Sequence, residues 1–179
     1  MSKYLELVEG SFNESHFNKQ TSQNPYVAYS IKDGKVIYTI VPKEDGTTTE
    51  IDLILIHETG IYVLESKNYS GYIFGSQKQE MWTQTLHSGR GKVEKHRFYN
   101  PIRQNKSHIK HLKSYLGLDI PFYSYIVFSD RCNFMNLEVD SNERVLHRCH
   151  LVKQLNLDIE WRSSVIDASK VDEIYNKLK

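Results

Sequence analysis

Cysteine is scarce in this sequence, and the shortage excludes one class of protein. Only two cysteines, Cys132 and Cys149, occur among 179 residues. They are too few for a disulfide framework in a chain of this size, which indicates a reducing compartment. Buried free thiols are the favoured interpretation. A disulfide between them, or a metal site shared with His147 and His150, remains the alternative.

Long apolar runs and a net charge are also missing. No apolar run reaches the roughly 18 residues that a membrane-spanning helix needs, and the first residues, with Glu6 and Glu9, lack the apolar core of a signal peptide. The 23 Lys and Arg residues nearly balance the 22 Asp and Glu residues, and the resulting formal charge of +1 gives no chain-wide attraction to nucleic acid or membrane. We therefore expect a cytoplasmic protein with no membrane segment, on which any basic surface is local.

The sequence does contain enough apolar material for a core. Hydrophobic residues make up 39% of the chain and aromatic residues 12%, which suits one compact domain over residues 1–179. Residues 1–24 are polar and fit one or two short helices. An Asp-Gly pair at 33–34 predicts a hairpin turn, and further turns are expected at 43–46 and 57–60. Strands are predicted over residues 26–31, 36–41, 51–56, 61–66, 72–74 and 81–86.

The clearest helix is expected to begin at Asn100-Pro101 and to end at Gly117, because Asn caps free amides and Pro suits the first helical position. One apolar stripe along it, which should pack on the sheet, comprises Ile102, Ile109, Leu112 and Leu116. We expect a basic loop over 90–97 before it, then strands over 122–128 and 144–152 and a helix over 171–178. Together these elements predict an α/β fold with a mixed central sheet flanked by helices.

Three polar residues lie at the ends of two predicted apolar strands. Asp52 begins strand 51–56, where an uncompensated carboxylate would be costly to desolvate. Glu65 and Lys67 end strand 61–66 and share a face, because side chains alternate along a strand. The turn at 57–60 makes the two strands antiparallel neighbours, so that the start of one meets the end of the other. The pattern therefore predicts that Asp52 and Glu65 converge beside Lys67.

The chemistry of this trio favours a divalent cation. Two carboxylates this close repel unless a cation bridges them, and hard oxygen ligands select Mg²⁺ or Mn²⁺ over Zn²⁺. Lys67 can orient or deprotonate a water for attack on phosphorus. From the pattern alone, an acid–lysine ion pair that only ends two strands is an equally good interpretation.

The segments EID at 50–52, TGIYVLESKNYSG at 59–71, MWTQ at 81–84 and FYNPIRQNKSH at 98–108 resemble the NERD family, the nuclease-related domain. The resemblance spans residues 42–130 in order and spacing. It implies a restriction-endonuclease-like core of the PD-(D/E)xK class, with Asp52 and Glu65 as metal-binding acids and Lys67 as the catalytic lysine. In related nucleases a Gln and a Tyr four residues later lie on the helix after the core sheet, and here Gln104 and His108 resemble that pair.

The chain departs from the family at its beginning. NERD proteins usually carry a Gly-Glu pair on a first helix that supplies a further acid, and no such pair precedes the sheet here. Glu14 is the best substitute as a third metal ligand, and Glu9 is the next. A missing third acid would weaken metal binding.

Basic residues suggest where nucleic acid would bind. The predicted loop contains Arg90, Lys92, Lys95, His96 and Arg97. A second basic stripe on the helix, with Arg103, Lys106, Lys110 and Lys113, is as well explained by a solvated face. His108 is a further candidate for nucleic-acid contact, and Tyr69, Tyr72 and Trp82 are candidates for stacking on bases, although core packing is the favoured role of Trp82.

These observations predict a Mg²⁺- or Mn²⁺-dependent nuclease that hydrolyses phosphodiester bonds of DNA. Its catalytic residues are Asp52, Glu65, Lys67 and Gln104. RNA remains open as a substrate, and so does a homodimer. One alternative is a non-catalytic nucleic-acid-binding module that retains the fold. Another is a scaffold domain in which the acid–lysine cluster only stabilises the structure.

Overall fold

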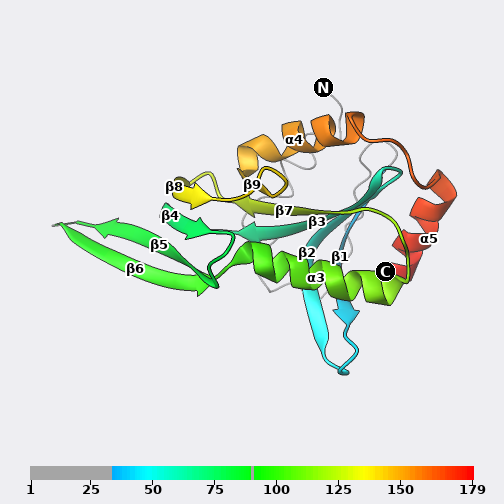
Figure 1. The fold of residues 1–179 in the computed structure, drawn as a ribbon, viewed down its shortest axis with the longest axis horizontal. Coiled ribbons are helices and arrows are strands. Elements are labelled where there is room, and N and C mark those ends of the chain that lie inside the picture. The colour runs from blue at the N-terminus through cyan, green and yellow to red at the C-terminus, as the bar shows by residue number, and fades with distance from the viewer. Residues whose placement is uncertain (1–33, 90) are drawn as a thin grey trace.

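The structure is a computed structural model of the chain, and it describes residues 34–89 and 91–179. The predicted helices within 1–24, the predicted strand 26–31, and residues Glu9, Glu14, Asp33 and Arg90 lie outside the described residues. The described residues form two mixed sheets with three helices around them (Figure 1). This α/β architecture is consistent with a restriction-endonuclease-like domain, as expected.

The first sheet has five strands in the order β1-β2-β3-β7-β9. Their bounds are Gly34–Pro42 (β1), Thr48–His57 (β2), Gly60–Lys67 (β3), Phe122–Phe128 (β7) and Arg144–His147 (β9). The first three strands are antiparallel neighbours, whereas β3, β7 and β9 run parallel to one another. The predicted strands 36–41, 51–56, 61–66 and 122–128 lie within these elements.

The second sheet has four strands in the order β6-β5-β4-β8. Their bounds are Gly71–Ser76 (β4), Met81–Ser88 (β5), Lys92–Tyr99 (β6) and Cys132–Glu138 (β8). Because β3 and β7 are parallel, the chain must cross over between them, and it does so through β4, β5, β6 and the helix α3. In Figure 1 the β5–β6 hairpin extends from the body of the molecule as an arm.

Three helices cover the first sheet: α3 (Pro101–Leu116), α4 (Arg148–Glu160) and α5 (Ala168–Leu178). Leu112 of α3 and Ile174 of α5 share one apolar cluster with Ile54 of β2. Leu151 and Leu155 of α4 belong to a second cluster that includes Leu55, the neighbour of Ile54. Because successive strand residues point to opposite faces, α3 and α5 cover one face of the sheet and α4 covers the other.

Helix α3 begins and ends where the sequence predicts. The Asn100 side chain accepts a hydrogen bond from the backbone N–H of Ile102, Pro101 is the first helical residue, and Gly117 adopts the left-handed conformation with φ of 66°. The buried face is less apolar than expected. Besides Ile102, Leu112 and Leu116 it carries the polar residues Asn105 and His108. Helix α5 contains the predicted 171–178, and its N-cap is Asp167.

The predicted basic loop over residues 90–97 is wrong from Lys92 onward. Residues Lys92–Tyr99 form β6, which pairs antiparallel with β5 along its whole length. All but Phe98 of these eight residues are exposed, so both faces of the strand carry polar side chains. Prediction of a strand from sequence depends on an alternation of buried and exposed side chains, and β6 has none. Its strand conformation is defined by the backbone hydrogen bonds to β5.

The predicted strand over residues 144–152 is wrong in its second half. Strand β9 ends at His147 and helix α4 begins at Arg148. The Asp130 carboxylate accepts hydrogen bonds from the Cys149 N–H and the Arg148 side chain, which holds the first turn of the helix. Leu151 and Leu155, four residues apart, then pack on the sheet as a helix requires.

The two cysteines are both free, and no disulfide occurs in the part of the chain that the structure describes. Cys132 is buried as expected, but Cys149 is exposed. His147 approaches the Cys132 backbone carbonyl and stacks on Phe134. Among residues 34–89 and 91–179, no helix is long and apolar enough to span a bilayer.

Candidate functional site

Asp52 lies in a β-bulge of β2. Residues 37 and 39 of β1 pair with residues 54 and 51 of β2, so that Asp52 and Leu53 together stand opposite a single residue of β1. A bulge bends its strand and changes the direction of a side chain, and bulges are frequent beside active sites. Here the bulge separates the regular core positions of β2 from the polar end of the strand.

The carboxylate of Asp52 points toward β3. Its Oδ2 accepts a hydrogen bond of 2.9 Å from the backbone N–H of Ser66, the residue after Glu65. The β2–β3 register, which pairs Leu53 with Leu64, places Asp52 and Glu65 side by side. Burial, and then the nearby Glu65 carboxylate, raise the pKa of Asp52 to about 6. The predicted convergence of the two acids is therefore present in the structure.

Glu65 is almost completely buried, with 3% of its surface exposed. Its Oε1 lies 2.6 Å from Lys67 Nζ and its Oε2 lies 3.2 Å from His108 Nε2. Burying a carboxylate is costly unless it is paired and hydrogen-bonded. Lys67 and His108 supply that compensation from β3 itself and from α3.

Helix α3 completes the site from the other side. Gln104 Oε1 accepts a 3.0 Å hydrogen bond from Lys67 Nζ, and Gln104 Nε2 lies 3.5 Å from His108 Nε2. His108 Nδ1 lies 2.7 Å from the hydroxyl oxygen of Thr49. Glu65, Lys67, Gln104 and His108 thus form a closed ring of polar contacts between β3 and α3. Because His108 lies on the buried face, it supports Glu65 and is a poor candidate for direct contact with nucleic acid.

Sequence reasoning missed two residues that hold this arrangement. Asn105 is fully buried, and its amide donates hydrogen bonds to the Val63 carbonyl (2.8 Å) and the Ser124 hydroxyl (2.9 Å). It therefore ties α3 to β3 and β7 next to the site. Thr49 is the other, through its contact with His108. The available signal was a polar residue within the apolar stripe of the helix, since buried amides are normally hydrogen-bonded.

The donor set fits a hard cation with few protein ligands. In residues 34–89 and 91–179, no group of three or more His, Cys, Asp and Glu side chains is arranged to hold a metal. Mg²⁺ is commonly bound by one or two carboxylates together with waters and substrate phosphates. Two converging carboxylates, of which Asp52 is half-buried and has a raised pKa, meet that requirement. The predicted third ligand, Glu14, lies outside the described residues.

The predicted nucleic-acid contacts Lys92, Lys95 and Arg97 lie on β6, away from this ring. Side chains alternate along a strand, so Lys95 and Arg97 share one face and Lys92 lies on the other. Trp82 is fully buried and packs against Phe98 and Phe128, which confirms its predicted role in the core. On α3, Arg103 donates to the Lys78 carbonyl and Lys106 pairs with Glu143.

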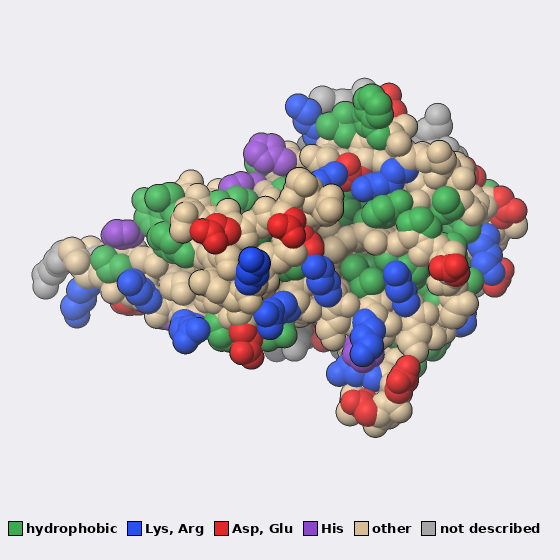
Figure 2. All heavy atoms as spheres, in the orientation of Figure 1, with side chains coloured by type: hydrophobic (Ala, Val, Ile, Leu, Met, Phe, Trp, Pro, Cys, Tyr) green, Lys and Arg blue, Asp and Glu red, His purple; other side chains and the backbone are tan. Residues whose placement is uncertain are grey.

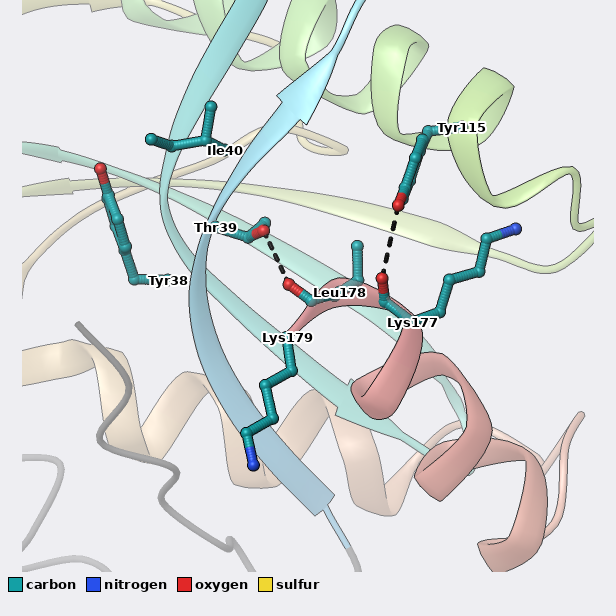
Figure 3. Close-up of a pocket in the computed structure, with 7 residues that line it drawn as sticks. All are labelled: Tyr38, Thr39, Ile40, Tyr115, Lys177, Leu178 and Lys179. Carbon is teal, nitrogen blue, oxygen red and sulfur yellow. Dashed lines mark hydrogen bonds between the residues drawn. The ribbon is translucent and has the colours of Figure 1, made fainter. Parts of the chain in front are cut away.

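A separate hollow of about 310 Å³ lies at the junction of β1, α3 and α5 (Figure 3). Tyr115 and the last three residues, 177–179, contribute to its wall. Thr39 and Tyr115 donate hydrogen bonds to the backbone carbonyls of Leu178 and Lys177 there. None of Asp52, Glu65 and Lys67 lines it, so this hollow is not part of the candidate site.

The mixed sheets and their flanking helices are consistent with a restriction-endonuclease-like domain. The chain belongs to the NERD family: the family model, described as nuclease-related domain, matches residues 9–129. An uncharacterized protein of Bacillus anthracis is 33% identical over 144 residues, which cover 80% of this chain and 64% of the relative. The chain thus spans less than two thirds of the length of that relative. No solved structure matches the chain.

Proposed function

We propose that this protein is a Mg²⁺-dependent nuclease that hydrolyses phosphodiester bonds of DNA, with Mn²⁺ as a substitute metal. The observation that carries the proposal is the convergence of Asp52 and Glu65 beside Lys67, with half-buried Asp52 at a strand bulge. Two carboxylates this close repel each other, which favours a bound cation between them. Membership of the nuclease-related family supports the reaction class.

Each residue then has a specific role. Asp52 and Glu65 would hold the metal, which when bound would stabilise the negative charge on the phosphate and activate a water. Lys67 would orient the attacking water or donate to a phosphate oxygen, because its ammonium already lies beside Glu65. Gln104 accepts a hydrogen bond from Lys67 Nζ and so positions that ammonium.

A nuclease assay with Mg²⁺ and with Mn²⁺ tests the proposal on linear, circular and single-stranded DNA and on RNA. We expect metal-dependent cleavage of DNA by the wild type, and no cleavage by Asp52→Ala or Lys67→Ala. Lys110→Ala, which removes an exposed lysine from α3, is the matched control and should cleave normally. Undiminished cleavage by Lys67→Ala would refute the assigned role, and cleavage of RNA alone would refute the substrate.

Measurement of metal binding distinguishes the proposed metal ligand Asp52 from Lys67, which is proposed to act on the water or the phosphate. Titration calorimetry with Mn²⁺ should detect binding by the wild type and by Lys67→Ala, since an ammonium repels a cation, but not by Asp52→Ala. Equal binding by Asp52→Ala would contradict the assignment of that carboxylate as a ligand.

One observation favours the alternative of a non-catalytic binding module. Both carboxylate oxygens of Glu65 already contact residues of the chain, Lys67 through Oε1 and His108 through Oε2. In such a module the contacts of Glu65 would hold α3 on the sheet in place of binding a metal. That alternative predicts binding of DNA at low salt with no cleavage and with no metal dependence, which the same two assays would detect.

A further inference from the structure

The second sheet has an outer face on which basic and aromatic side chains form two rows. In the first row Lys95 of β6 pairs with Thr85 of β5, and Thr85 pairs with Tyr72 of β4. In the second row Arg97 pairs with Thr83, and Thr83 pairs with Phe74. Directly paired residues point to the same side of a sheet. Each row therefore consists of a cation, a threonine and an aromatic ring on one face.

This face is the one turned away from the apolar core. The alternate residues of the same strands, Ile73, Trp82 and Phe98, pack in the apolar cluster on the inner side. On the outer side, Lys95 and Arg97 are exposed, Phe74 has 37% of its surface exposed, and Tyr72 is half-buried. An aromatic ring exposed on a sheet beside cations suggests a binding surface, because large aromatic side chains are mostly buried.

The two cations have no counter-ion in the part of the chain that the structure describes. Among the described residues, neither Lys95 nor Arg97 has an acidic partner, whereas His96 on the opposite face of β6 lies near Glu94. Glu138 is an acid of the outer side and lies on β8, at the other edge of the sheet from β6. It is paired with Ser76 of β4 and lines a hollow together with Phe74 and Thr83. Three strand spacings separate these edges, or roughly 14 Å. Positive charge therefore collects along β6, and Figure 2 shows Lys and Arg side chains along this arm.

We propose that this outer face binds single-stranded nucleic acid, with bases stacked on Tyr72 and Phe74 and phosphates held by Lys95 and Arg97. Aromatic rings combined with a basic track are the features that bind single strands without sequence preference. The inference deepens the proposed function by naming the form of the nucleic acid, and it rests on that function for its biological meaning.

Geometry favours a single strand over a duplex. Tyr72 and Phe74 are two residues apart on one strand, so their side chains leave the sheet about 6.8 Å apart. Stacked bases in B-form DNA rise only about 3.4 Å each. Two neighbouring bases can therefore each stack on one of these rings only if the strand is stretched and the base faces are free. Paired bases within a duplex offer neither condition.

Binding can be measured apart from cleavage with the full chain carrying Lys67→Ala and with EDTA present. Fluorescence anisotropy would compare a labelled oligothymidylate with a labelled duplex of the same length. We expect tighter binding of the single strand. Replacing one stacking ring, in Phe74→Leu or Tyr72→Leu, should weaken it by about fivefold or more. Leu keeps an apolar side chain, so thermal melting should show that the fold is intact.

The contribution of Lys95 and Arg97 is tested by how the affinity for the single strand depends on salt concentration. Replacing both Lys95 and Arg97 with Gln should reduce the slope of log affinity against log salt by about 1.4 for a single strand. Lys153→Gln, which removes an exposed lysine of α4, and Leu157→Ala, at a residue of α4 with 40% of its surface exposed, are the controls and should bind normally.

Equal affinity for duplex and single strand, or unchanged affinity in both Leu variants, would overturn the proposal. No binding of either nucleic acid at low salt would also overturn it and would favour a protein partner for the face. Because these measurements need no hydrolysis, their outcome is independent of whether Asp52, Glu65 and Lys67 form an active site.

Discussion

At the scale of single residues, the ionised carboxylate of Asp52 that a metal would require is unfavourable for the stability of the metal-free fold. Burial and the neighbouring Glu65 raise its pKa to about 6, so the folded protein holds the Asp52 proton more tightly than the unfolded chain does. Its ionisation in the absence of metal therefore destabilises the fold, by an amount on the order of 3 kcal/mol. A bound cation would reverse this cost.

The sign of this effect gives the first prediction. Well below its ordinary pKa of 3.8 Asp52 is protonated in both states and costs nothing, and the cost grows from that pH until it is complete above about pH 6. Asp52→Asn should therefore raise the free energy of unfolding in EDTA at about pH 8, and change it little at about pH 4. Urea denaturation at both pH values measures the difference. A loss of stability at the higher pH would contradict the assignment.

His108 gives a second prediction at this scale. It contacts Glu65 through Nε2 and Thr49 through Nδ1, so it holds a proposed metal ligand without needing to touch the substrate. Partners of metal ligands typically change metal affinity by about ten- to hundredfold when they are removed. We expect such a loss of Mn²⁺ affinity in His108→Ala.

Two further variants separate positioning by His108 from a loss of folding. His108→Gln, which keeps a donor toward Glu65, should recover part of the affinity. Thr49→Val has nearly the same shape as Thr49 but loses the hydroxyl, and it should show a smaller loss than His108→Ala. Unchanged calorimetric titrations of both His108→Ala and Thr49→Val would show that this pair is not needed for metal binding.

At the scale of elements, helix α3 contacts the second sheet through its N-cap and contributes Gln104 and His108 to the candidate site on the first sheet. Its N-cap residue, Asn100, is fully buried. Besides capping the helix, its amide donates to three backbone carbonyls of the turn between β4 and β5, those of Ser76, Gln77 and Gln79. The start of the helix, and with it Gln104 one turn later, is therefore positioned by the second sheet.

Asn100→Ala should destabilise the protein by about 2 kcal/mol or more, because it removes a helix cap together with the hydrogen bonds of a fully buried amide to the turn between β4 and β5. Asn100→Ser is the matched variant, since it keeps the capping oxygen but loses the amide, and it should recover about 1 kcal/mol. Chemical denaturation of the three proteins measures this order. Equal stabilities of Asn100→Ser and the wild type would mean that only the cap matters.

At the scale of the whole molecule, metal binding and folding should be linked. A ligand that binds only the folded state at a hundred times its dissociation constant stabilises it by about 2.7 kcal/mol. For a chain of this size we expect Mn²⁺ to raise the melting temperature by roughly 5 to 10 °C. The increase should shrink as the pH falls through 6, because protons then compete for Asp52. Asp52→Ala, heated under the same conditions, should show no such increase.

Much of the architecture could be predicted from local pattern. The strands 36–41, 51–56, 61–66 and 122–128 lie within observed strands, and α3 has its predicted N-cap and C-cap. Asp52, Glu65 and Lys67 were predicted to converge and do so. These features depend on neighbours a few residues apart, on alternation along a strand and on capping, all of which are readable in a single segment.

Features that depend on distant pairing could not be predicted in this way. Strand β6 exists because it pairs with β5, and its exposed, charged residues carry no alternation of their own. The bulge at Asp52 is a mismatch between β1 and β2 that appears only when the two strands are paired.

By itself the sequence determined most strands of the first sheet and the bounds of α3, which residues carry the candidate chemistry and which family the chain resembles. Only the tertiary structure decided that His108 faces Glu65, that Asn105 ties α3 to the sheet, and that Lys95 and Arg97 share a face with Tyr72 and Phe74. The physical reason is that a side chain's partners across a sheet or a helix interface are set by register and packing between segments far apart in the chain, and no local periodicity encodes them.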